Sequence, residues 1–164
     1  MNRLAYGFSI GLGGMHDAGS NVTTCGNCDY NPAAVEFDGH IGGFLSPRFA
    51  LMAEGQVNAQ TVALDAYGED TVLSQSALMI AGQYWLHPQF WIKGGIGFAH
   101  LYADNPYEVW DFGTGGALMV GAGVELMSAR NFAVDLQGRI IRGSYDGFDD
   151  SVTSGTVGVG INWY

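Results

Sequence analysis

Residues of this chain alternate between two kinds along several segments, and this period of two constrains the fold more than any other feature. From residue 4 to residue 13 every second side chain is large and apolar (Leu4, Tyr6, Phe8, Ile10, Leu12), and those between them are small. The same alternation returns at 49–58 and 90–99. Successive side chains of a β-strand point to opposite faces, so each segment predicts a strand with one apolar face. The other face is too small and too weakly charged for water, but it fits the lumen of a narrow barrel whose apolar face meets lipid.

The composition also argues against an ordinary soluble surface. The 164 residues suit one domain, only 13% of them are charged, and 26 are Gly. No run of about 18 or more apolar residues occurs, so the sequence predicts no transmembrane helix. Because lipid accommodates only helices and closed sheets, we expect one barrel domain over residues 1–164. An exported barrel needs a signal peptide and none precedes the first strand, so we expect the mature part of a bacterial outer-membrane protein.

Short connections divide the chain into hairpins. They lie at 46–48, 87–89 and 127–131, and each precedes an aromatic residue; these aromatics are 41 and 42 residues apart, at Phe49, Phe90 and Phe132. This spacing is typical of a hairpin repeat with one short turn and one long loop. It predicts eight strands, at about 3–14, 35–45, 49–60, 72–86, 90–102, 115–126, 132–142 and 152–163. We therefore predict an all-β, eight-stranded antiparallel up-and-down transmembrane β-barrel with short periplasmic turns and long extracellular loops.

A soluble ligand-binding barrel is the alternative at the level of the fold. It would bury the apolar face and expose a glycine-rich strand face to water, which is unfavourable. Aromatic residues near the strand ends favour the membrane instead, because amphipathic rings prefer the two interfaces. The expected aromatic girdles contain Tyr6, Phe49, Tyr84, Phe90, Tyr102, Phe132 and Trp163.

Three segments carry a resemblance to a known family: "SPRFALMAEGQ", "HPQFWIKGGIGFAHL" and the ending "GTVGVGINWY". With them the whole chain resembles the small outer-membrane β-barrels of Gram-negative bacteria, the OmpA-like and OmpX-like group. The resemblance implies contact with membrane lipid and lipopolysaccharide. Proteins of this family usually end in an aromatic residue that the outer-membrane assembly machinery recognises, and Tyr164 resembles that residue. Here the outward series ends at Trp163, so Tyr164 has inward parity, which departs from the family pattern.

The inward face carries polar and charged residues that we expect to form an interior network. They include Glu36, Asp38, His40, Glu54, Gln56, Asn58, Gln75, Gln83, Lys93, Glu125, Asp135, Gln137 and Arg139. Pairing across the first turn places His40 opposite Glu54 and Asp38 opposite Gln56. Pairing across the second turn places Gln83 opposite Lys93 and Trp85 opposite Trp91. We expect the two indoles, Trp85 and Trp91, to plug the lumen near the short-turn rim.

Inward acids outnumber inward bases. Five carboxylates accompany Lys93, Arg139 and, when protonated, His40, so at least one must be neutral, hydrated or bound to a cation. One interpretation is a narrow cation-selective pore. The other, which we favour, is a hydrated scaffold network, because eight strands leave little free bore.

Two further motifs carry chemistry. Cys25 and Cys28 lie in the longest loop, and we expect a disulfide there, since an oxidising exterior favours one and a zinc site would need further soft ligands. Register places Ser76 opposite His100 on the outward face near the loop rim. A Ser–His dyad of this kind could serve an acyl hydrolase acting on outer-leaflet lipid, although an interfacial His is the simpler interpretation.

Charge is concentrated at the loop end. Of the sixteen acids, eleven fall in four loop segments, and the net charge is −10, which argues against nucleic acid as a partner. Asp146, Asp149 and Asp150 form a short acidic segment that lacks the spacing of an EF-hand. We expect no cofactor, and only weak divalent-cation binding by these loops beside lipopolysaccharide.

These observations predict a structural or surface-interaction protein with a plugged polar interior and acidic extracellular loops. An outer-leaflet lipid hydrolase, a cation pore and a soluble ligand-binding barrel are the alternatives. No motif identifies an enzyme, and the sequence names no extracellular partner.

Overall fold

The computed structural model describes residues 4–17, 20–21, 33–63, 70–104, 109–145 and 148–164. Its elements are strands, with the bounds β1 Leu4–Asp17, β2 Ser20–Asn21, β3 Ala34–Ser46, β4 Phe49–Ala63, β5 Asp70–His87, β6 Phe90–Asp104, β7 Val109–Ser128, β8 Phe132–Tyr145 and β9 Phe148–Trp163. In this part of the chain no helix is long and apolar enough to span a membrane.

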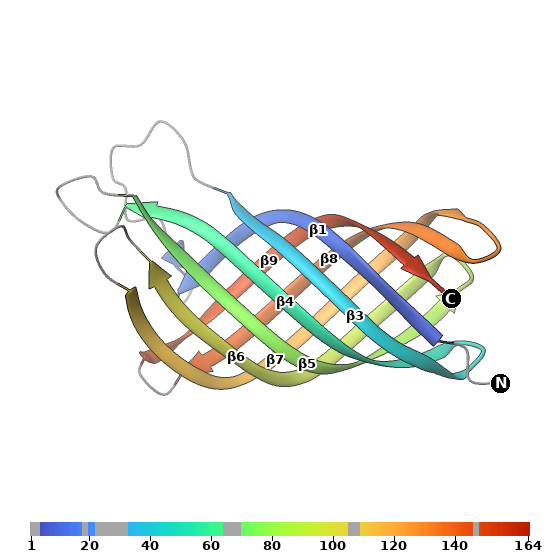
Figure 1. Ribbon diagram of the computed structural model, residues 1–164, viewed down its shortest axis with the longest axis horizontal. Coiled ribbons are helices and arrows are strands. Elements are labelled where there is room, and N and C mark those ends of the chain that lie inside the picture. Colours follow the sequence, from blue (N-terminus) through green and yellow to red (C-terminus); the bar gives the residue numbers. More distant parts are fainter. Residues whose placement is uncertain (1–3, 18–19, 22–32, 64–69, 105–108, 146–147) are drawn as a thin grey trace.

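Eight long strands close into one barrel (Figure 1). Each pairs antiparallel with its neighbours in chain order, and β1 pairs with β9 to complete the ring. The two residues of β2 pair antiparallel with the end of β1, where Asn21 pairs with His16. The predicted eight-stranded up-and-down topology is therefore confirmed. Most strands run a few residues further at the loop end than predicted; β7, for example, begins at Val109 rather than near residue 115.

The predicted register is confirmed at both turns for which it was derived. His40 pairs with Glu54 and Asp38 with Gln56, while Gln83 pairs with Lys93 and Trp85 with Trp91. The period of two and the positions of the turns are sufficient to specify these pairs, because a slip of one residue would invert both faces.

The outward face is apolar. Phe98, Leu78 and Ile96 are 69%, 68% and 66% exposed, and similar residues continue around the ring. Near the short-turn end Tyr6 stacks on Trp163, with ring centroids 5.4 Å apart and an angle of 10° between the rings. An exposed surface of this extent requires lipid rather than water.

Three short turns of equivalent construction form one rim of the barrel. The β3–β4, β5–β6 and β7–β8 turns each contain a carbonyl that accepts a backbone hydrogen bond from an inward residue at a later strand end: Arg48 from Trp85 (2.9 Å), Gln89 from Glu125 (2.8 Å) and Asn131 from Tyr164 (3.3 Å). The acceptors repeat at the hairpin spacing found in the sequence. This repeat brings Trp85, Glu125 and Tyr164 to equivalent places around the rim.

Candidate functional site

A central charged layer crosses the lumen. The Arg139 guanidinium on β8 lies 2.7 Å from Glu36, 3.2 Å from Asp38 and 3.3 Å from Glu54. Lys93 on β6 contacts the other oxygen of Glu54 at 2.9 Å. All five residues are buried. Buried ions are stable only when paired and hydrogen-bonded, so this layer joins strands from opposite sides of the barrel.

Asp38, His40 and Glu54 offer three ligand atoms within 4.8 Å of one another, the spacing of a metal site. The same carboxylates already contact the positive Arg139 guanidinium, and Glu54 also contacts Lys93. His40 Nδ1 lies 3.4 Å from Asp38 Oδ1. A metal cation would face two fixed positive charges here, so the donor set does not fit one.

A second layer lies at the short-turn rim and binds two carboxylates with neutral donors. Trp85 Nε1 donates to Glu125 Oε1 at 3.0 Å, and the Tyr164 hydroxyl donates to the same oxygen at 3.3 Å. Asp135 Oδ2 accepts from Trp91 Nε1 at 3.1 Å and from the Asn162 amide at 2.9 Å. Phe44, Trp85 and Tyr164 pack ring against ring, with centroids 5.2–5.9 Å apart.

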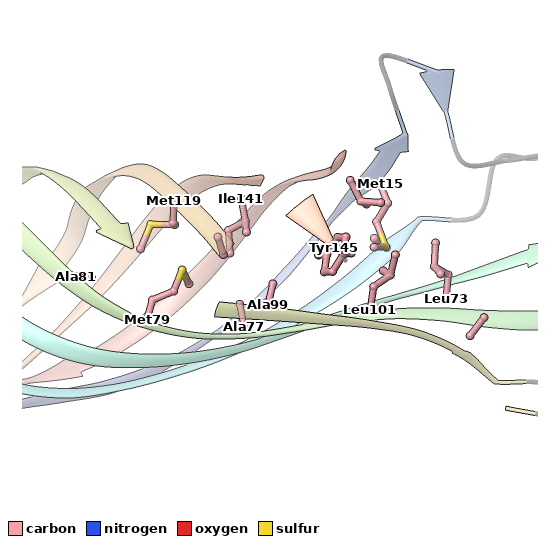
Figure 2. Packing of buried hydrophobic residues seen from close by; sticks show 14 residues of the cluster. Met15, Leu73, Ala77, Met79, Ala81, Ala99, Leu101, Met119, Ile141 and Tyr145 are labelled. Atoms are coloured by element: carbon pink, nitrogen blue, oxygen red, sulfur yellow. The ribbon is translucent and has the colours of Figure 1, made fainter. Parts of the chain in front are cut away.

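The loop-side layer is largely apolar, which the sequence interpretation missed. Figure 2 shows Met15, Leu73, Met79, Leu101, Met119, Ile141 and Tyr145 packed inside the barrel. A short polar chain lies with them: Asn58 donates to Ser154 at 3.0 Å, and Ser154 to Gln75 at 2.8 Å. The apolar residues have inward parity, so the same alternation that gave the charged residues could have identified them.

On the outward face near the loop rim, Ser76, His100 and Thr114 form a row across three strands. His100 Nδ1 lies 3.0 Å from the Thr114 hydroxyl, and its Nε2 lies 3.6 Å from Asp111. Among the hydrogen bonds of the described residues, none joins Ser76 to His100. The sequence did not show which acid could orient His100; in the structure it is Asp111. A β-bulge in β7 brings Asp111 to the imidazole. Gly113 in this bulge has φ 93°, and its backbone N–H donates to the Asp111 carboxylate.

Other candidate residues fall outside what the structure describes. Cys25, Cys28 and Asp146 are not among the described residues, and Asp149 and Asp150 lie on β9 but their side chains are not described. The expected disulfide and the acidic segment therefore remain predictions.

Comparison with solved structures identifies the fold. Neisserial surface protein A superposes with a TM-score of 0.63 at 12% identity, covering 98% of this chain and 95% of that one. The attachment invasion locus protein Ail of Yersinia pestis, in complex with the heparin analogue sucrose octasulfate, gives a TM-score of 0.59 at 14% identity, covering 98% and 99%. The chain has the fold of the eight-stranded outer-membrane β-barrels.

This fold is that of barrels from the bacterial outer membrane, and the exposed apolar belt fits contact with membrane lipid. A second structure of Ail, at 15% identity, gives a TM-score of 0.56 and covers 96% of this chain and 97% of that one. No protein-family model matches the sequence, and no curated protein is significantly similar to it.

Proposed function

We propose that the protein is a non-conducting outer-membrane barrel whose long loops form the contact surface for an extracellular partner. The observation that carries the proposal is the lumen, in which an aromatic layer, a charged layer and an apolar layer succeed one another along the axis. The inward acids that could have selected cations are held by Arg139 and Lys93 or by indole and amide donors. These contacts support the scaffold interpretation over a cation-selective pore.

The negative charge of the loop segments favours a partner that carries positive charge. Ail, a structural neighbour, is an attachment protein that was crystallised with a sulfated polyanion. This chain instead carries a net charge of −10, and eleven of its acids fall in sequence segments at or beside the long loops, several of them at strand ends. A polyanion would be repelled, so the proposed partner is a cationic surface, or lipopolysaccharide bridged by Mg²⁺ or Ca²⁺.

Planar-bilayer recording tests the closed lumen. Wild-type protein refolded into detergent should give no channel events over many insertions, and Trp85→Ala combined with Tyr164→Ala should also stay silent, because the charged and apolar layers remain. Regular unitary currents from the wild type would overturn the proposal. A bead-binding assay tests the loop surface separately. The protein should bind poly-lysine beads, Mg²⁺ should compete with this binding, and heparin beads should not bind the protein.

We also propose that the outer-membrane assembly machinery contacts the end of β9. Tyr164 packs inward against Phe44 and Trp85, while Trp163 lies on the outward face beside Tyr6. We therefore assign the aromatic contact with the machinery to Trp163. Trp163→Ala should slow membrane insertion in cells more than Tyr164→Ala, and the reverse order would contradict this assignment.

A second candidate function is an acyl hydrolase at the outer leaflet, favoured by the contacts of His100 with Thr114 and Asp111. The Thr114 hydroxyl would attack an ester carbonyl while its proton passes to His100 Nδ1. The alcohol would leave with that proton, and water would then hydrolyse the acyl-threonine. Hydrolysis of a fluorescent lipid ester should be abolished by His100→Ala and by Thr114→Val and restored by Thr114→Ser; Ser76→Ala reports whether the paired serine is the nucleophile instead. Wild-type protein without activity ends this candidate.

A further inference from the structure

A cavity of about 760 Å³ opens at the short-turn rim, on the periplasmic side of the barrel. Its inner wall is aromatic, formed by Phe44, Trp85 and Tyr164. The Glu125 carboxylate also lines it, although this residue is only 5% exposed. Arg48 and His87 also line it, and both are exposed. The cavity thus combines an apolar wall with one buried negative group, the usual composition of a small-molecule site.

The carboxylate in this wall has a like-charged neighbour. Glu125 on β7 pairs directly with Asp135 on β8. Like charges directly opposite each other in a sheet are destabilising, and burial makes their repulsion stronger. Trp85, Tyr164, Trp91 and Asn162 donate hydrogen bonds to the pair, and all four donors are neutral.

The cationic side chains Arg139 and Lys93 of the lumen form their ion pairs with other carboxylates. Arg139 contacts Glu36, Asp38 and Glu54, and Lys93 contacts Glu54 while lying 5.4 Å from the Trp91 ring. The ion pairs of the described residues include neither Glu125 nor Asp135. The rim layer therefore holds two carboxylates without a cationic partner in this part of the chain. Water screens the exposed Arg48 and His87 more than it screens the buried pair.

We propose that this cavity binds a primary ammonium group carried on an apolar stem, with Glu125 as its counter-charge. The ammonium would donate to the carboxylate, and the stem would lie against the Phe44, Trp85 and Tyr164 rings. Aromatic faces attract cations. The buried carboxylate adds a charge-assisted hydrogen bond to the ammonium, which is stronger in surroundings of low dielectric constant. The site faces the periplasm, so it is separate from the loop surface and independent of the function proposed above.

Benzylamine is a suitable probe, and Trp85 is a built-in reporter because its indole N–H donates to Glu125 at 3.0 Å. In two-dimensional NMR of the ¹⁵N-labelled full chain in detergent micelles, benzylamine should shift the Trp85 indole signal saturably, and the Trp91 signal less. Trp85→Phe identifies the reporter signal by its loss. Benzyl alcohol has the same ring but no charge. Its affinity should be lower than that of benzylamine by about tenfold or more, since the charge-assisted contact is lost.

Glu125→Gln should weaken benzylamine binding by about tenfold or more, whereas Asp104→Asn, which removes an exposed charge at the loop end of β6, should leave it unchanged. Equal shifts with benzylamine and benzyl alcohol in the wild type would show only hydrophobic partition and overturn the proposal. Because this comparison uses wild-type protein, it holds even where Glu125→Gln fails to fold. Equal affinity of folded Glu125→Gln and wild type would overturn it as well.

Discussion

Arg139 on β8 and Glu36 on β3 form an ion pair of 2.7 Å across the lumen, although their strands are not neighbours in the sheet. The same guanidinium also reaches Asp38 and Glu54. One cation thus serves three carboxylates from two strands of the opposite wall. The barrel shape, rather than any pair of adjacent strands, creates this contact, so Arg139 is the residue on which the central layer most depends.

Replacing Arg139 with Met should destabilise the barrel by about 3–5 kcal/mol, because the carboxylates would stay buried without their main counter-charge. The measurement is urea unfolding in lipid vesicles, followed by the heat-dependent shift of the folded band on gels. Arg142→Met is the matched control, since Arg142 is exposed and its side chain contacts Ser151 on the outward face. It should change stability by about 0.5 kcal/mol or less, and equal effects of the two variants would contradict the ion-pair argument.

Gly123 provides the space for the Trp91 indole. A Cβ at residue 123 would lie 2.3 Å from Trp91 Cζ2, and Trp91 is 2% exposed. Gly123→Ala should therefore displace the ring and destabilise the protein by about 1–3 kcal/mol, the usual effect of overpacking. At Gly116 a Cβ would meet nothing within 4 Å, so Gly116→Ala is a control expected to be nearly neutral. Urea midpoints and the Trp91 indole signal in NMR measure both, and an unmoved Trp91 signal in Gly123→Ala would show that the indole does not need this space.

Tyr164 lies beyond the end of β9, at the rim, and burial raises the pKa of its phenol, with the nearby Glu125 and Asp135 carboxylates acting in the same direction. The protonated form therefore favours the folded state. This contribution is complete below the unfolded pKa of about 10 and is lost as the pH rises through the folded pKa. Stability of the wild type should fall above about pH 10 more steeply than that of Tyr164→Phe. Parallel pH profiles from urea unfolding would mean that the phenol is free to ionise.

The alternation of side chains was sufficient to predict the barrel, the register across two turns and the inward or outward face of strand residues away from the bulges, because a regular sheet has a period of two. The same parity also predicts inward positions for Met79 and Met119, which are buried in the lumen but were not among the predicted interior residues. The contact between Arg139 and Glu36 depends on the curvature of the closed ring, which pairwise register does not contain. Asp111 reaches His100 only through the bulge at Gly113, which shifts the register and defeats simple parity.

The position of the bilayer can be tested on the outward face. Ile96 lies near the middle of β6, 66% exposed, between Ile80 and Leu118 on the adjacent strands. Ile96→Lys should destabilise the barrel by about 2–4 kcal/mol, because a lysine at the centre of the hydrocarbon is poorly solvated. Leu4 is 57% exposed but lies at the start of β1, close to the short-turn rim, so Leu4→Lys should cost only about 0–1 kcal/mol. Unfolding in vesicles measures both, and similar costs at the two depths would show that the apolar belt is not centred on Ile96.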